Sequence, residues 1–190
     1  MKSDARRQEV VSKAAELFDQ AGYYTTNMSE LARAVGLEKP TLYHYFSGKD
    51  EILFWIHEEF INHLIEKGES RDSSTLTATA ELEATFKDLL ELMDSHRGHV
   101  RVFFEHGREL TEEHQSTIRT KRDKYQAIVQ GIVERGIKEK EFRDLDPRLV
   151  TLAIFGMCNW SYQWYRSGGA LQSDEIASFF FSLLLDGLRV

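Results

Sequence analysis

Residues 25–49 constrain the fold of this chain most strongly, because they encode two short helices joined by a tight turn. Asn27 is a favourable helix N-cap and Glu30 follows three residues later, which is the spacing of a capping box. The helix that begins there has one apolar face, formed by Met28, Leu31, Ala32 and Val35. Gly36 suits the left-handed conformation that ends a helix, and Pro40 suits the first turn of the next one.

The second helix of this pair turns an unusual set of side chains outward. Its spacing places three residues on the inner side, namely Leu42, Tyr45 and Phe46. The opposite side carries Lys39, Pro40, Tyr43 and His44, with Thr41 at its edge. Aromatic rings exposed together beside a cation indicate a binding partner. DNA fits this surface, because the second helix of a helix-turn-helix enters the major groove.

These helices resemble the DNA-binding region of TetR-family transcriptional regulators, over TTNMSELARAVGLEKPTLYHYFSGKDEIL and above all in its LYHYF followed by a lysine. With this resemblance, we predict that double-stranded operator DNA is contacted by Thr26, Asn27, Ser29, Lys39, Pro40, Thr41, Tyr43, His44 and Lys49. Ser29 departs from the family, which often has arginine there, so readout by the first helix of the pair is weaker or mediated by water.

Thr26 and Lys49 are also predicted to contact phosphates on electrostatic grounds. The hydroxyl of Thr26 precedes a helix start, where free amides and the helix dipole favour a phosphate. Lys49 opens the next helix and opposes its dipole, so we interpret it as a phosphate contact, with a surface lysine as the alternative. Arg6 and Arg7 near the N-terminus are either phosphate contacts or solvated side chains.

The net charge of −7 is unevenly distributed along the chain. Residues 1–50 carry seven basic and seven acidic side chains, so the whole acidic excess lies in residues 51–190. This balance disfavours nonspecific coating of nucleic acid or anionic membrane, while a neutral head can still dock locally. The single cysteine, Cys158, is predicted to be a small buried hydrophobe. The N-terminus lacks the apolar segment of a signal peptide, and we expect a cytoplasmic protein.

Hydrophobic periodicity predicts an all-α fold of about nine helices. We expect a helix-turn-helix DNA-binding domain over residues 1–47 and a ligand-binding and dimerisation domain over residues 48–190. The expected helices after the DNA-binding pair cover residues 49–67, 75–95, 99–110, 112–137, 147–166 and 173–188. Residues 68–74 are polar and form the expected linker, and Arg97 with Gly98 is the expected break before the sixth helix.

The last two expected helices are apolar on almost every side. A chain of this size has too little interior to cover both of them, so we predict a homodimer in which they pair across a twofold axis. The uncharged run 149–165 is too short and too polar for a membrane span, and we expect no membrane partner.

A small-molecule effector is expected in the second domain. The predicted pocket is lined by Leu89, Met93, Phe103, Phe104, Tyr125, Val129, Phe155, Asn159, Trp160 and Trp164, which are otherwise ordinary core residues. The segment CNWSYQWYRSGG resembles the corresponding region of TetR-family members that control fatty-acid or steroid degradation and respond to acyl-CoA thioesters. The resemblance implies an acyl-CoA, whose phosphates would be met by Arg97, Arg101, Arg119 and Arg122.

We predict no catalytic residue, no cofactor and no metal site. The spacing of His96, His99, His106 and His114 allows a metal, but the first two straddle an expected helix break and carboxylates with matching spacing are lacking apart from Glu105. The favoured interpretation is therefore a ligand-responsive repressor, with residues 49–67 as the lever between the two domains. Its alternatives are a multidrug-efflux type of regulator with another effector and, less favoured, an all-helical enzyme or carrier.

Overall fold

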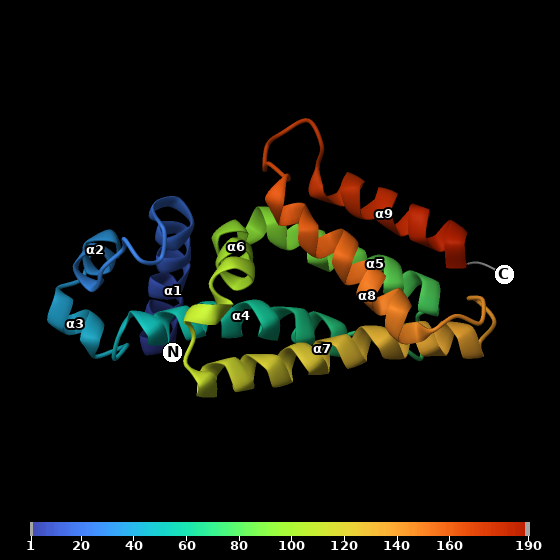
Figure 1. Ribbon diagram of the computed structural model, residues 1–190, viewed down its shortest axis with the longest axis horizontal. Coiled ribbons are helices and arrows are strands. Elements are labelled where there is room, and N and C mark those ends of the chain that lie inside the picture. Colours follow the sequence, from blue (N-terminus) through green and yellow to red (C-terminus); the bar gives the residue numbers. More distant parts are fainter. Residues whose placement is uncertain (1, 189–190) are drawn as a thin grey trace. The chain divides into compact units, whose positions relative to one another are not determined.

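The computed structural model describes residues 2–188, and over these residues it contains α-helices, two short 3-10 helices and no strand (Figure 1). The first elements are α1 (Lys2–Ala21), α2 (Met28–Ala34), α3 (Lys39–Tyr43) and α4 (Lys49–Glu69). They are followed by α5 (Ala78–Ser95), α6 (Arg97–Glu105), η1 (Gly107–Glu109), α7 (Glu112–Lys138), α8 (Pro147–Trp160), η2 (Ser161–Gln163) and α9 (Ser173–Leu188). The prediction of an all-α fold with about nine helices is confirmed.

The chain forms two compact units. The first unit contains Met1–Ile61 together with His96–Arg119, and the second contains Asn62–Ser95 together with Thr120–Val190. Both α4 and α7 continue from one unit into the other, whereas α5 and α6 are separated at the unit boundary by a break in the helix. The unit that holds the helix-turn-helix therefore also holds α6, η1 and the first part of α7.

Several helix boundaries differ from those expected, and α6 ends at Glu105, not at residue 110. Helix α5 begins at Ala78, not at residue 75, because the Glu141 carboxylate accepts hydrogen bonds from the amides of Ala78 and Thr79, at 3.0 and 2.9 Å. The break before α6 lies at His96, whose backbone leaves the helical region, and Arg97 already belongs to the helix. Helix α8 ends at Trp160, not at residue 166.

The core of the first unit lies where α1 packs on α6. On α1 its buried side chains are Val10, Val11, Ala14, Ala15 and Phe18. Gly98 allows close approach of the two helices, because a Cβ atom at this position would lie 2.8 Å from the backbone carbonyl carbon and oxygen of Ala15. A larger residue at position 98 would force these helices apart.

In the second unit, α5 packs mainly along α9 and also contacts α8. The Phe86 ring of α5 meets the Phe181 ring of α9 edge to face, with centroids 5.9 Å apart. Cys158 of α8 is buried, as predicted, and burial raises the pKa of its thiol. Tyr165 follows α8 and its hydroxyl donates to Asp94 Oδ1 at 2.8 Å, which fixes the chain after the helix has ended.

Candidate nucleic-acid interface

The start of α2 is fixed by a reciprocal cap. The Asn27 side-chain oxygen accepts hydrogen bonds from the amides of Ser29 and Glu30, at 2.9 and 3.2 Å, and the Glu30 carboxylate accepts from the Asn27 amide at 2.8 Å. The predicted capping box is confirmed. Because the Asn27 oxygen is used by the cap, its side-chain NH2 is the group suited to donate to a phosphate.

The turn from α2 to α3 depends on Gly36. Its φ of 62° lies in the left-handed region, and the next amide, from Leu37, reaches back to the carbonyl of Ala32 at 2.9 Å. This is the hydrogen bond of a helix C-terminus that is closed by glycine. Helix α3 then begins at Lys39 with Pro40 in its first turn, so the sequence of this turn sets the direction of α3.

The two sides of α3 differ in exposure as its spacing predicts. Leu42 is fully buried and Phe46, just beyond the helix, is 1% exposed. The outward residues of α3 and the position after it are exposed, namely Lys39, Pro40, Tyr43 and His44, while Thr41 is half-exposed. Almost half of the Tyr43 side chain is open to solvent, at 47%. The helix therefore presents a cation, an aromatic hydroxyl and an imidazole that can reach base edges or phosphates.

Lys49 and Thr26 have local partners that the sequence did not reveal. The Lys49 ammonium donates to the backbone oxygens of Tyr23 and Thr26, at 2.6 and 3.0 Å, and lies 4.2 Å from the centre of the Tyr23 ring. Burial lowers the pKa of Lys49. Thr26 is itself buried, and its hydroxyl donates to the Gly22 carbonyl at 2.9 Å. This geometry does not support a phosphate contact by the Thr26 hydroxyl.

The two arginines of α1 connect that helix to the DNA-binding pair. Arg6 donates to the Val35 carbonyl at 2.7 Å, and Arg7 donates to the Tyr45 carbonyl at 3.3 Å. The Arg7 guanidinium also lies 4.9 Å from the centre of the Trp55 ring. The sequence predicted either a phosphate contact or a solvated side chain for these arginines, and neither alternative included hydrogen bonds to backbone carbonyls of the DNA-binding pair. Nothing in the local sequence distinguishes a guanidinium that binds distant carbonyls from one in solvent.

The residues of the predicted effector pocket belong to both compact units. In the first unit, Phe103 is buried and its ring lies 4.3 Å from that of Phe60, while Phe104 is half-buried. In the second unit, four members are buried, namely Leu89, Met93, Tyr125 and Val129. The Tyr125 ring stacks on Phe155 with centroids 5.7 Å apart, so the structure brings these two together.

The remaining pocket candidates lie nearer the surface of the second unit. Asn159 is half-exposed, whereas Trp160 and Trp164 are 64% and 42% exposed. Among the arginines expected to meet phosphates, Arg101 is occupied by an ion pair with Asp19, at 3.2 Å. The other three are exposed, namely Arg97, Arg119 and Arg122.

Among the described residues, no group of three or more His, Cys, Asp or Glu side chains is placed to hold a metal ion. The histidines considered from the sequence have other neighbours. His99 Nε2 lies 3.5 Å from a Glu59 carboxylate oxygen, and the His114 ring stacks on Phe54 at 4.1 Å. No helix within residues 2–188 has the length and hydropathy needed to cross a membrane.

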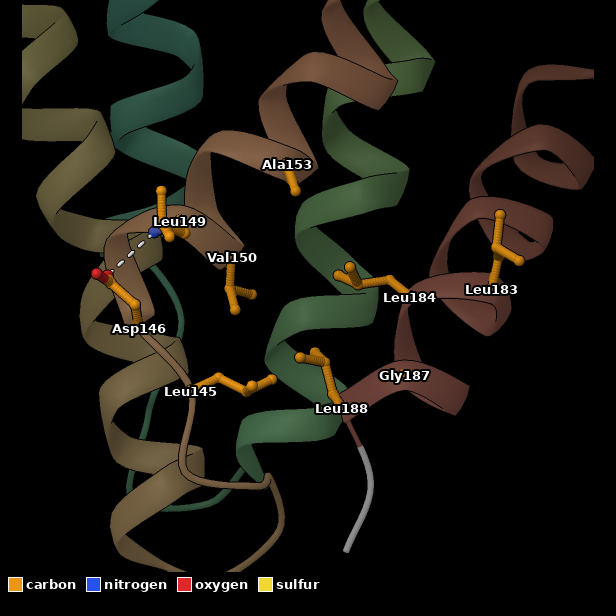
Figure 2. A pocket seen from close by; sticks show the side chains of 9 residues that line it. All are labelled: Leu145, Asp146, Leu149, Val150, Ala153, Leu183, Leu184, Gly187 and Leu188. Atoms are coloured by element: carbon orange, nitrogen blue, oxygen red, sulfur yellow. Dashed lines mark hydrogen bonds between the residues drawn. The ribbon is translucent and has the colours of Figure 1, made fainter.

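Helices α8 and α9 expose a large apolar surface. The exposed side chains include Leu149, Leu152, Trp160, Phe179 and Leu183. A hollow of about 380 Å³ lies on this surface, lined by Leu145, Asp146, Leu149, Val150, Ala153, Leu183, Leu184, Gly187 and Leu188. Figure 2 shows Leu184 and Leu188 of α9 extending toward α8 across this hollow. Apolar surface of this kind is usually covered by a partner.

Two family models match the chain. Residues 10–55 match the bacterial regulatory proteins of the tetR family, and residues 75–188 match the tetracyclin repressor-like C-terminal domain. The HTH-type transcriptional repressor KstR2 of Rhodococcus jostii strain RHA1 is 29% identical over 185 residues, which cover 96% of this chain and 91% of the relative.

Solved structures agree with these matches. The ketosteroid transcriptional regulator KstR2 of Mycobacterium tuberculosis superposes with a TM-score of 0.87 at 26% identity, covering 97% of this chain and 95% of the other. AibR, in a crystal structure with isovaleryl coenzyme A and operator DNA, superposes with a TM-score of 0.83 at 25% identity, covering 95% and 98% of the two chains.

Proposed function

This chain belongs to the TetR family of bacterial regulatory proteins, and within that family we propose that it is a ligand-responsive repressor. The matched proteins are transcriptional regulators, which confirms the prediction that the chain is a regulator and not an enzyme. The observation that carries the proposal is the exposed surface of α3, with Lys39, Tyr43 and His44 directed outward beside a capped α2. We expect the protein to act in the cytoplasm, where operator DNA is found.

In the proposed complex, α3 enters the major groove of the operator. Tyr43 and His44 reach base edges or phosphates, and Lys39 neutralises a phosphate. The N-terminus of α2 approaches the backbone, where its amides and the Asn27 NH2 favour an anion. Ser29 is exposed in the first turn of α2 and is short, so its contribution to sequence readout is small or runs through water.

We propose that two copies associate through α8 and α9. The exposed leucines and aromatic rings of these helices support this assignment, because a second copy would remove them from water. The hollow between Leu184 and Leu149 would receive apolar side chains of that copy. A twofold dimer then presents two α3 helices about 34–36 Å apart, as successive major grooves of a pseudo-palindrome require.

The proposed effector is a small hydrophobic ligand, with an acyl-CoA thioester as the favoured class. The likeness to KstR2 repressors and to AibR, which was crystallised with isovaleryl coenzyme A, supports this class. Phe155 and the buried Tyr125 supply an aromatic wall for such a ligand. By linkage, an effector that releases DNA must bind better to the conformation that binds the operator worse.

Selection of bound sequences from random duplexes, followed by titration at several salt concentrations, tests the proposal. We expect a pseudo-palindromic site bound by two copies, with affinity falling steeply as salt rises. Absence of any salt-sensitive duplex binding would contradict the proposal and favour an all-helical carrier or enzyme. Thermal-shift assays with acyl-CoA thioesters and with cationic drugs separate the two effector classes, because a ligand stabilises the folded state that it binds.

A further inference from the structure

Within the first unit, the segment α6–η1 contacts α1, α4 and the loop between α1 and α2. Its N-terminal half packs on α1 at Gly98, where there is no room for a Cβ atom beside the Ala15 backbone. One turn later, Arg101 Nη1 lies 3.2 Å from Asp19 Oδ1 in an ion pair with α1. His99 faces Glu59 of α4. Helix α6 therefore contacts both long helices that flank α2 and α3 in the sequence.

The η1 turn reaches the loop between α1 and α2 directly. The Tyr24 hydroxyl donates to Glu109 Oε1 at 3.0 Å, and His106 Nδ1 lies 3.5 Å from the same oxygen. The His106 ring also lies 5.7 Å from the Tyr23 ring. Burial alone would raise the pKa of Glu109, but hydrogen bonds from Tyr24 and His106 lower it overall, so the carboxylate is charged at neutral pH.

The same loop is also held by Lys49. Its ammonium binds the carbonyls of Tyr23 and Thr26, and the following residue, Asn27, is the N-cap of α2. The cap residue Asn27 lies only three positions after Tyr24 in the chain. A displacement of η1 would therefore reach the start of α2 without passing through the α4 backbone.

We propose that η1 positions the α1–α2 loop, and with it the start of α2, through the Tyr24–Glu109 contact. This inference rests on the proposed function and names two positioning residues that neither the local sequence nor the related proteins single out. The chain enters α6 from α5, which belongs to the second unit, and leaves η1 into α7, which continues into that unit. Tyr24 and Glu109 are positioning residues in this scheme.

A double-mutant cycle on operator affinity tests the contact. We measure operator binding by fluorescence anisotropy for Tyr24→Phe, Glu109→Ala and the double variant, on a duplex selected with the unaltered protein. Each single variant is expected to bind roughly two- to tenfold more weakly, the range for loss of one hydrogen bond, and the double variant no more weakly than either. Glu113→Ala is the matched control, because Glu113 is exposed at the start of α7 and its loss changes the charge equally.

The cycle separates positioning from direct contact with DNA. If Tyr24 touched a phosphate itself, Tyr24→Phe alone would weaken binding and Glu109→Ala would behave like Glu113→Ala, which would overturn the proposal. Unchanged affinity in both single variants, or additive losses, would overturn it as well. If the unaltered protein binds no duplex, the proposed function is wrong. If the unaltered protein binds a duplex and the variants behave as just described, only the positioning role of Tyr24 and Glu109 is wrong.

A second variant tests the packing of α6 on α1. Gly98→Ala places a methyl group against the Ala15 backbone, whereas Gly131→Ala, in α7, meets no atom within 4 Å and serves as the control. We expect Gly98→Ala to weaken operator binding at least twofold and to speed amide hydrogen exchange in residues 22–31, with the dimer intact. Exchange and affinity equal to those of Gly131→Ala would show that the packing of α6 on α1 does not help to position the α1–α2 loop, which would overturn this part of the proposal. If Gly98→Ala does not fold, the Tyr24–Glu109 cycle decides the question.

Discussion

The ammonium group of Lys49 lies 2.6 Å from the backbone oxygen of Tyr23, with the ring of the same tyrosine 4.2 Å away. This contact explains a lysine at a helix start, where the dipole alone disfavours a cation. The first residue of α4 thus fixes the loop that precedes α2. The integrity of the DNA-binding pair depends on a side chain that is outside it in sequence.

Replacing this lysine tests that dependence. Lys49→Met keeps the aliphatic stem but removes the hydrogen-bond donor to two backbone carbonyls. We therefore expect the free energy of unfolding to fall by about 1–3 kcal/mol. Urea denaturation followed by circular dichroism measures the change. Lys87→Met is the control, because Lys87 forms only an exposed pair with Glu83 on α5. Equal stability of the two variants would show that the loop does not need the ammonium.

Lys39 is expected to neutralise one phosphate per copy of the protein. Lys39→Ala should weaken binding to all duplexes by a similar factor. It should also reduce the slope of the logarithm of the binding constant against the logarithm of the salt concentration by about one per contact. Titration at several salt concentrations, with Lys87→Ala as a charge-matched control, measures the slope. An unchanged slope for Lys39→Ala would remove this residue from the interface.

The apolar surface of α8 and α9 predicts an effect on assembly. Leu183→Glu places a charge on a surface that we propose is covered by the second copy, and we expect the dimer to dissociate. Ala127→Glu, at an exposed position of α7, is the control. Analytical ultracentrifugation distinguishes monomer from dimer. A Leu183→Glu protein that remains dimeric would exclude this face as the interface.

Acid should destabilise the fold through His57. This side chain is 1% exposed, its Nδ1 hydrogen-bonds the Leu53 carbonyl at 2.9 Å, and burial lowers its pKa to about 4. The unfolded chain, with an ordinary histidine pKa near 6.5, binds the proton more readily. The contribution of neutral His57 to the free energy of unfolding is therefore fully present above about pH 6.5. It is lost as the pH falls through 4, which lowers the free energy of unfolding by up to about 3 kcal/mol.

Urea unfolding of the unaltered protein and of His57→Met between pH 7 and pH 4 measures this contribution. The variant should lose less stability over this range, because it has no proton to bind at that position. His63→Met is the control for removal of a histidine elsewhere on α4. Parallel pH profiles for the unaltered protein and His57→Met would contradict the assigned role.

Local signals made the DNA-binding pair predictable from the sequence. The Asn27–Glu30 cap and the Gly36 turn each depend on residues a few positions apart, and both form as expected. The start of α5 was placed too early, because the Glu141 carboxylate that binds its first two amides lies more than sixty residues away in the chain, although Thr77 also caps the Ala80 amide locally. The end of α8 was placed too late because apolar periodicity continues through Tyr165, although that residue binds Asp94.

Tertiary contacts explain what the sequence left open at the candidate site. The partners of Arg6, Arg7 and Lys49 are backbone carbonyls, which have no signature in the sequence. The Tyr24–Glu109 contact joins residues that are 85 positions apart, so neither suggests the other. In the predicted pocket, periodicity identified apolar faces but did not separate the buried Tyr125 from the exposed Trp160.

Operator binding by a Tyr43→Ala dimer tests the central claim most directly, since Tyr43 is the large exposed side chain of α3. The measurement is fluorescence anisotropy on the selected duplex, with sedimentation of the same samples. We predict at least about tenfold weaker binding, as for a lost base or phosphate contact, with the dimer unchanged. An intact Tyr43→Ala dimer that binds the operator as tightly as the unaltered protein would contradict the assignment of this face to DNA.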